Sequence, residues 1–154
     1  MSKKYLILLI VFLIGILSII AFKALSTKEQ LQQSKNMLQV GKCKFNIETA
    51  KTAEEKKQGL SGRQSLDQYT GIMFYYDQPK IYSFWMKDMN FPLDFVWINE
   101  NTIVDLSENI PPPTNSNNIP RASSRKPVNK VLEINAGMIK NCEINIGSEI
   151  EKTY

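Results

Sequence analysis

The first strong pattern in the chain is an unbroken apolar run from Leu6 to Phe22, with lysines on both sides. A helix rises about 1.5 Å per residue, so this run spans roughly 26 Å, close to the roughly 30 Å hydrocarbon core of a bilayer. The run is also longer than the apolar part of a usual signal peptide, which has about 7 to 15 residues. We therefore predict a transmembrane helix that anchors residues 1–23, with membrane contact over residues 5–22. A cleaved signal peptide and a fully buried core helix are the alternatives.

A polar segment, residues 24–41, follows the apolar run and is rich in Gln, Lys and Ser. Its leucines are too sparse to form a packed face, and we interpret it as a stalk. Lys3 and Lys4 precede the apolar run, and the positive-inside tendency keeps such residues in the cytoplasm. The sequence thus predicts a single-pass protein of the cytoplasmic membrane whose domain lies on the extracytoplasmic side, or is secreted if the segment is cleaved.

Residues 42–154 have the pattern of one small domain. Cys43, Phe45 and Ile47 alternate with polar residues, which is typical of a half-buried strand. Thr52 and Glu55 then have the spacing of a capping box, and Gly59 supplies the stop of one short helix.

The rest of this domain is divided into short strands by turn residues. Such spacing favours an antiparallel sheet curled into a barrel or sandwich, and hence a mainly β fold. A Pro-rich, basic stretch at residues 110–127 predicts a long surface loop. Strands are expected at residues 71–76, 81–86, 93–98, 102–106, 128–134 and 143–150, with turns at 77–79 and 99–101 and one helical turn at 137–141.

Composition limits the chemistry. The formal charge of +4 comes mainly from scattered lysines, and no arginine-rich run occurs, so no nucleic-acid partner is expected. Histidine is absent, which excludes Ser-His-Asp and Cys-His catalysis and the usual zinc sites. No acidic metal-binding loop is found, and neither a metal nor another cofactor is expected.

The chain has two cysteines, Cys43 and Cys142. In an exported domain they could pair, and so long a closed loop would stabilise the fold by roughly 4 kcal/mol in the entropy model. Two separate buried thiols are the alternative, because the sequence does not give the distance between the two Cα atoms.

Several short motifs together resemble the domain-of-unknown-function 192 family over residues 42–150. The most specific is Phe84-Trp85-Met86-Lys87 followed by Pro92-Leu93-Asp94. The resemblance implies a compact, mainly β domain that is often exported or membrane-tethered, with no established activity. The residues for which we expect a structural role are Thr52, Glu55, Gly59, Gly71, Pro92 and Gly137.

This chain departs from the family pattern at several positions. The family's Gly-Leu-Met-x-Arg reads Gly59-Leu60-Ser61-Gly62-Arg63, its Lys-Asn-Thr reads Lys87-Asp88-Met89, and its late Gly-Asp reads Gly147-Ser148. The first two changes fall among the polar and charged residues of these motifs.

Charged residues beside large apolar ones are the candidate site, because burying a charge is costly unless it is paired. In one interpretation they form an internal network in which Arg63 is bonded to Glu133 or Asp94. In a second they line a cleft with Trp85, which could hold a sugar ring or a peptide. In a third, Asp94 or Asp88 forms a general acid and base pair with Glu133. The ligand-binding candidates are Arg63, Trp85, Lys87, Asp88, Asp94 and Glu133.

We therefore expect a membrane-anchored extracytoplasmic binding or envelope-associated interaction module, whose partner is a cell-envelope polymer, sugar or peptide. A hydrolase that uses the carboxylate pair and a purely structural scaffold domain are the alternatives. An enzyme is the less favoured class, and the sequence gives no oligomeric state.

Overall fold

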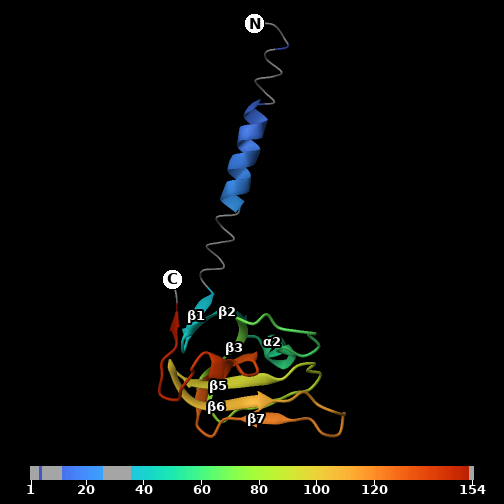
Figure 1. Ribbon diagram of the computed structural model, residues 1–154, viewed down its shortest axis with the longest axis vertical. Helices are drawn as coiled ribbons and strands as arrows, with labels where there is room; N and C mark the ends of the chain where they lie inside the picture. Colours follow the sequence, from blue (N-terminus) through green and yellow to red (C-terminus); the bar gives the residue numbers. More distant parts are fainter. Residues whose placement is uncertain (1–3, 5–11, 26–35, 153–154) are drawn as a thin grey trace. The chain divides into compact units, whose positions relative to one another are not determined.

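The computed structural model describes residue 4, residues 12–25 and residues 36–152. The chain divides into two compact units, Met1–Lys35 and Asn36–Tyr154. In the first unit, residues 12–25 are helical (Figure 1).

The predicted membrane anchor, residues 1–23, lies only partly within the described chain, since residues 5–11 of the apolar run are outside it. Over the described residues, no helix is both long and apolar enough to span a bilayer. Most of the predicted stalk, residues 26–35, also lies outside the described residues.

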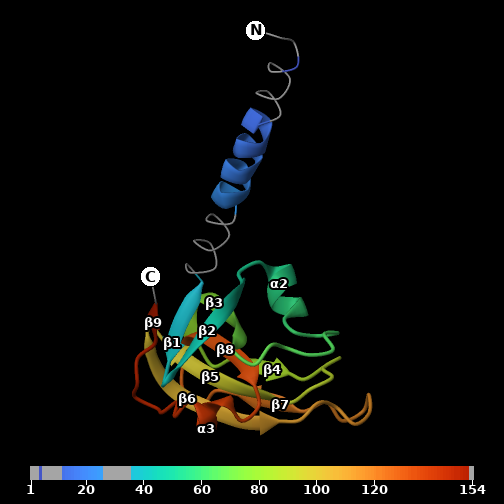
Figure 2. The ribbon, with the colours of Figure 1, turned by 45° about the horizontal axis from the view of Figure 1, so that its top comes forward.

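The second unit is built on a curved seven-stranded sheet with the strand order β6-β5-β8-β3-β2-β1-β9, and on a two-stranded sheet of β4 and β7 (Figures 1 and 2). Two short helices complete it. The elements are β1 (Met37–Val40), β2 (Cys43–Ala50), α2 (Ala53–Gln58), β3 (Thr70–Lys80), β4 (Ser83–Trp85), β5 (Leu93–Asn99), β6 (Thr102–Ile110), β7 (Arg121–Ser123), β8 (Val128–Asn135), α3 (Met138–Asn141) and β9 (Glu151–Lys152).

Because side chains alternate along a strand, the large sheet has two buried faces. The first face carries Phe45, Val96 and Leu132, and is covered by Met138 and Ile139 of α3 and by the segment that follows α3. The second face carries Phe74, Phe95, Trp97 and Val131.

The second face is covered by the β4–β7 sheet and by the turns around Leu60 and Met86. Phe84 of β4 packs against Phe74, Phe95 and Trp97, with ring centroids 4.8 to 5.9 Å apart. The small sheet is therefore fixed to the large one by aromatic contacts, and α2 lies on the same side of the domain (Figure 2).

The mainly β fold is confirmed, but the sheet is mixed rather than wholly antiparallel. β2 and β3 are parallel neighbours. A parallel pair needs a crossover connection, usually a helix, and α2 supplies it. The capping box predicts this helix, but it does not predict the direction of the strands that the helix connects.

Other boundaries also need correction. β1 pairs with β2, so the domain begins before residue 42 and the end of the predicted stalk is a strand. The predicted turn at 77–79 lies within β3, whereas the helical turn predicted at 137–141 is confirmed as α3. Residues 143–150 are not a strand, although an isolated bridge joins Thr102 and Glu149. β7 lies inside the predicted 110–127 loop.

Cys43 and Cys142 form a disulfide, which decides between the two alternatives left open by the sequence. The bond joins the start of β2 to the segment after α3. The Lys42 N–H also donates to the Cys142 carbonyl at 2.7 Å. The segment after α3 is thus held to the start of β2.

Candidate functional site

A short helix and the turn after it form one wall of the candidate site. The capping box predicted for α2 is confirmed, because the Glu55 N–H donates to the Thr52 hydroxyl at 3.1 Å and the Thr52 N–H to the Glu55 carboxylate at 2.9 Å. Gly59 ends the helix with φ +48°. A Cβ at Gly59 would lie 3.2 Å from Cζ of Phe74, so glycine lets the turn approach the sheet closely.

Glu133 lies on the opposite wall, in the middle of β8. It is in register with Ile72 on one side and Phe95 on the other, and its side chain therefore points to the second face of the sheet. Glu133 is 6% exposed, and its carboxyl makes no hydrogen bond with any residue that the structure describes. Burial raises the pKa of Glu133 to about 8, which keeps this carboxyl largely protonated and uncharged at neutral pH.

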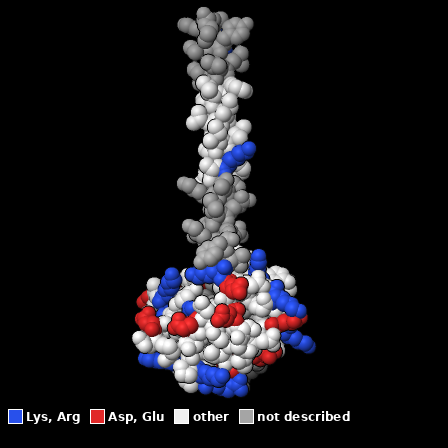
Figure 3. All heavy atoms as spheres, turned by 90° about the vertical axis from the view of Figure 1, so that its left-hand side faces the viewer, with Lys and Arg blue, Asp and Glu red and all other residues white. Residues whose placement is uncertain are grey.

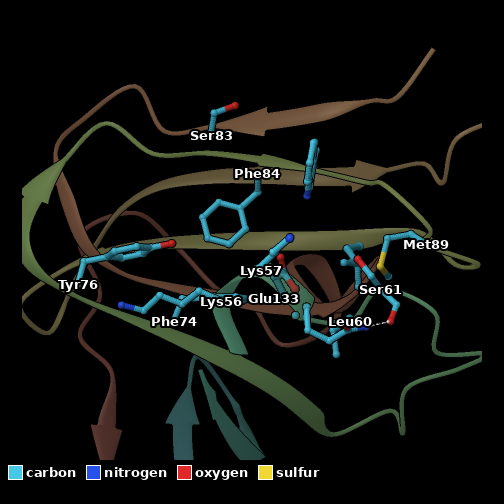
Figure 4. Close-up of a pocket in the computed structure, with 14 residues that line it drawn as sticks. Lys56, Lys57, Leu60, Ser61, Phe74, Tyr76, Ser83, Phe84, Met89 and Glu133 are labelled. Carbon is cyan, nitrogen blue, oxygen red and sulfur yellow. Dashed lines mark hydrogen bonds between the residues drawn. The ribbon is translucent and has the colours of Figure 1, made fainter. Parts of the chain in front are cut away.

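A pocket of about 120 Å³ lies between these walls (Figure 4). It is formed by the end of α2 and its turn, by β3, β4, β8 and the start of β5. Figure 4 shows the Tyr76 hydroxyl turned toward the interior of the pocket, which Lys57 and Glu133 also line. The polar and charged residues that line the pocket are Lys56, Lys57, Gln58, Ser61, Tyr76, Ser83 and Glu133.

Trp85 lies at the rim of the pocket and is 44% exposed, as the cleft interpretation requires. Two cations lie near its ring: the Lys87 Nζ is 5.6 Å from the ring centroid and the Arg121 guanidinium carbon 5.7 Å. Trp97 is buried instead, and its indole N–H donates to the Ser107 hydroxyl at 2.9 Å. The two tryptophans therefore differ in exposure and in hydrogen bonding.

Tyr76 forms the other side of the rim. Its ring stacks on Tyr82 at 3.8 Å between centroids, and the Lys56 Nζ lies 4.5 Å from the Tyr76 centroid. Burial, followed by the neighbouring Tyr82 and Glu133, raises the pKa of Tyr76 to about 12. The Tyr76 hydroxyl is therefore a neutral donor at neutral pH, and it makes no hydrogen bond with the described residues.

Arg63 does not bond to Glu133 or Asp94, so the internal network predicted from the sequence is wrong in its partners. The guanidinium instead makes a two-pronged pair with Glu48 of β2, at 2.8 and 2.6 Å. Hydrogen bonds from Arg63 lower the pKa of Glu48. The pair fastens the turn after α2 to the sheet, and Arg63 does not line the Glu133 pocket.

Asp94 is fully buried on the first face of the sheet, because it is in register with Ile134. Its carboxylate accepts from the Asn109 N–H at 2.8 Å and from the Ile139 N–H at 2.9 Å. Asp94 and Glu133 thus lie on opposite sides of the sheet. They do not form the carboxylate pair that the hydrolase interpretation needs.

Asp88 and Lys87 line a neighbouring hollow together with Trp85, and neither lines the Glu133 pocket. Asp88 has φ +57°, a left-handed conformation that Asn and Asp adopt more readily than most residues. Over the described residues, no group of acidic or cysteine side chains is arranged to hold a metal ion.

Sequence reasoning identified Trp85 and Glu133 but missed the rest of the pocket. Lys56, Lys57 and Tyr76 are ordinary residues for a helix surface and a strand, and no motif distinguishes them. The one usable signal was Gly59, since a helix that stops in a strained glycine beside a sheet brings its last turn close to the strands.

The comparisons with known proteins agree with this fold. The family model of DUF192, described as "Uncharacterized ACR", matches residues 25–152. The chain belongs to the DUF192 family. The resemblance that the motifs indicated is thereby confirmed.

Two solved structures are similar to this DUF192 chain. One, from Sinorhizobium meliloti, is described as a "putative transcription regulator"; it is 29% identical, with a TM-score of 0.65 over 75% of this chain and 89% of that one. The other, a protein of unknown function from Novosphingobium aromaticivorans, is 26% identical, with a TM-score of 0.66 over 75% of this chain and 83% of that one. No curated protein matches the chain.

Proposed function

We propose that this DUF192 domain is a binding module that receives one end of a ligand in the pocket between α2 and the sheet. The observation that carries the proposal is Glu133, a buried carboxyl that faces the pocket and has no protein partner among the described residues. The side-chain atoms of described residues that are closed off from solvent without a partner belong to Asn99 and Ser124, so the Glu133 oxygens are open to the pocket. A ligand that hydrogen-bonds to Glu133 would supply the partner that no described residue supplies.

The rim supports binding rather than catalysis. Trp85 offers an exposed ring at the mouth of the pocket. Asp94, the second carboxylate that hydrolysis would need, lies on the other face of the sheet. A scaffold role would explain Asp94 and Arg63, which are fully paired, but it gives no reason to keep an unpaired carboxyl at Glu133.

We further propose that the domain works outside the cytoplasmic membrane, held there by the apolar run in residues 5–22. The disulfide between Cys43 and Cys142 supports this location, since disulfides persist in oxidising compartments. The charge pattern gives weaker support for an envelope partner than the disulfide gives for the location, because acidic and basic side chains are interspersed on the domain face shown in Figure 3.

A reporter fusion tests this location. Alkaline phosphatase fused after Tyr154 should be active in cells. An inactive fusion, together with an active cytoplasmic reporter fused at the same site, would contradict the location.

The binding proposal is tested with the full-length chain in detergent, labelled with ¹⁵N at tryptophan. The two indole N–H signals separate the two environments, since Trp85 lies at the pocket and Trp97 is hydrogen-bonded to Ser107 in the core. The probes are N-acetylglucosamine, glycerol 3-phosphate, tri-alanine and tri-alanine amide, at millimolar concentration.

We expect at least one probe to shift the Trp85 signal while the Trp97 signal stays fixed. The variant Glu133→Leu, which replaces the carboxyl with an apolar group of similar size, should abolish the shift. If no probe moves the Trp85 signal, or if Glu133→Leu responds as the wild type does, the binding proposal is wrong.

A further inference from the structure

The size of the pocket limits what can enter it. A cavity of 150 Å³ in another protein holds one benzene molecule, and the pocket here is about 120 Å³. A whole hexose ring with its hydroxyl groups is larger than benzene and does not fit. The ligand must therefore insert a small end group of about five or six heavy atoms.

The donors in the pocket select an end group that accepts hydrogen bonds. At neutral pH, Glu133 is largely protonated and Tyr76 is neutral, so each presents an O–H group. Neither hydroxyl is used by the described residues. Two unused donors that face one small pocket suit a group with two acceptor oxygens.

Charge at the mouth favours a negative end group. Lys56 and Lys57 line the pocket from the last turn of α2, and no ionised carboxylate lines it at neutral pH, because Glu133 is the acidic residue there. An ammonium group would meet two lysines without a counter-charge. An anion would be attracted by them, more weakly at high salt.

Phosphate is a poorer match than carboxylate. A phosphate group has three exposed oxygens and carries up to two charges, and proteins usually bind it with arginine forks or helix N-termini. The pocket lies at the C-terminal end of α2, and Arg63 is engaged by Glu48, which disfavours both anions alike. The two groups therefore differ in the number of donors that they need and in their charge. A carboxylate needs fewer donors and carries a single charge.

We infer that the pocket binds a terminal carboxylate with a small side group. The carboxylate oxygens accept hydrogen bonds from the Glu133 and Tyr76 hydroxyls, and the charge of Lys57 attracts the carboxylate. The inference rests on the proposed binding function and names its ligand class. Two sources share this chemistry: the end of a peptide chain whose last residue is alanine or glycine, and a free short acid such as propanoate.

The experiment uses the same labelled, full-length chain and compares tri-alanine with tri-alanine amide, which differ only in the terminal group. Propanoate tests the free acid. We expect tri-alanine to bind at least about tenfold more tightly than its amide, since a hydrogen bond to a charged acceptor is worth about 1.5 to 3 kcal/mol. Propanoate binding as tightly as tri-alanine would support the carboxylate and assign the free acid as its source.

Two variants locate the contact. Tyr76→Phe removes one donor without changing the shape of the pocket and should weaken tri-alanine about tenfold. Tyr75→Phe is the matched control, because Tyr75 packs against the core on the first face of the sheet, and it should bind normally. Binding should also fall as the pH rises above 8, because Glu133 then loses the proton that it donates to the ligand. The other titratable groups that line the pocket are Lys56, Lys57 and Tyr76.

The outcomes distinguish this inference from the proposed function. If the acid and the amide bind equally, or if a sugar or phosphate probe binds more tightly than tri-alanine, the carboxylate inference is overturned and the binding module stands. Equal loss of affinity in Tyr75→Phe and Tyr76→Phe would also overturn the inference. If no probe moves the Trp85 signal, both proposals fail.

Discussion

Asp94 and Glu133 lie on the neighbouring strands β5 and β8, yet their side chains point to opposite faces of the sheet, since Asp94 is in register with Ile134 and Glu133 with Phe95. The two carboxyl groups consequently differ in every respect that matters for function. Asp94 accepts two backbone hydrogen bonds and holds α3 against the sheet. Glu133 accepts none from the described residues and faces a pocket.

Asp94→Ala should therefore damage stability and not binding. Removing a buried carboxylate that accepts from the Asn109 and Ile139 N–H groups leaves both donors unpaired, which we expect to lower the free energy of unfolding by about 2 to 4 kcal/mol. Urea unfolding measures the loss. Asp94→Asn keeps one acceptor oxygen and should cost less; equal costs for the two variants would contradict this role.

Glu133 should make stability depend on pH near neutrality. Its pKa is about 8 in the folded chain and near 4.5 in the unfolded chain, so between these values the folded state binds one more proton. Stability is then fully present below about pH 4.5 and is lost as the pH rises toward 8, with a slope of up to about 1.4 kcal/mol per pH unit. Urea unfolding at a series of pH values measures this slope.

Glu133→Gln is the control for that slope, because the amide is nearly the same shape and does not titrate. The variant should unfold with a much flatter dependence between pH 5 and 8. A wild-type curve that is already flat over this range would show that Glu133 is not buried as a neutral acid.

At low pH a different carboxyl should dominate. Hydrogen bonds from Arg125 hold the pKa of Asp105 at about 2, below its usual value of 3.8. A lowered pKa contributes stability above pH 3.8, and this contribution is lost as the pH falls toward 2. Asp105→Asn should therefore remove part of the acid-induced destabilisation and leave the slope near neutrality unchanged. The same urea series, extended below pH 4, tests both statements.

The sequence was most informative where local chemistry decides the structure. The capping box at Thr52 and Glu55 and the alternation of Phe45 and Ile47 predicted α2 and β2 correctly, because each depends on residues close in the chain. The parallel pairing of β2 and β3 could not be predicted in this way, since it depends on where the chain goes after α2. β3 was also predicted too short, because it continues to Lys80. Its pairing with β8 is nevertheless irregular between Tyr75 and Lys80, where Asp77 and Pro79 lie.

At the candidate site, the residue types indicated which side chains need a partner or solvent, but they did not indicate which residues those side chains contact. The sequence suggested that Arg63 and Glu133 need either partners or solvent. Arg63 has its partner in Glu48, whereas Glu133 is buried, has no partner among the described residues and faces the pocket. Which face of the sheet a carboxylate occupies depends on register, and one residue of shift reverses it. The separation of Asp94 from Glu133 therefore required the strand pairing itself.

Reduction of the disulfide should lower the stability of the domain. Cys43 and Cys142 are 99 residues apart, and opening a loop of this length restores conformational freedom worth roughly 4 to 5 kcal/mol to the unfolded chain in the entropy model. Urea unfolding with and without dithiothreitol measures the change. Cys43→Ser with Cys142→Ser should match the reduced wild type and be insensitive to the reductant; a double variant as stable as the oxidised protein would contradict the prediction.

Gly59 and Gly62 give a matched pair for testing how the turn after α2 forms the pocket. Both have positive φ, but Gly59 also has ψ −126°, and a Cβ there would lie 3.2 Å from Phe74 and 3.9 Å from the Glu133 carboxyl, whereas a Cβ at Gly62 meets nothing within 4 Å. Gly62→Ala should cost about 1 kcal/mol through backbone strain alone, and Gly59→Ala about 2 to 3 kcal/mol. Gly59→Ala should also move the Trp85 indole signal by displacing the turn, while Gly62→Ala leaves it in place. Equal stabilities for the two variants would mean that the close approach of Gly59 to the sheet does not form this wall of the pocket.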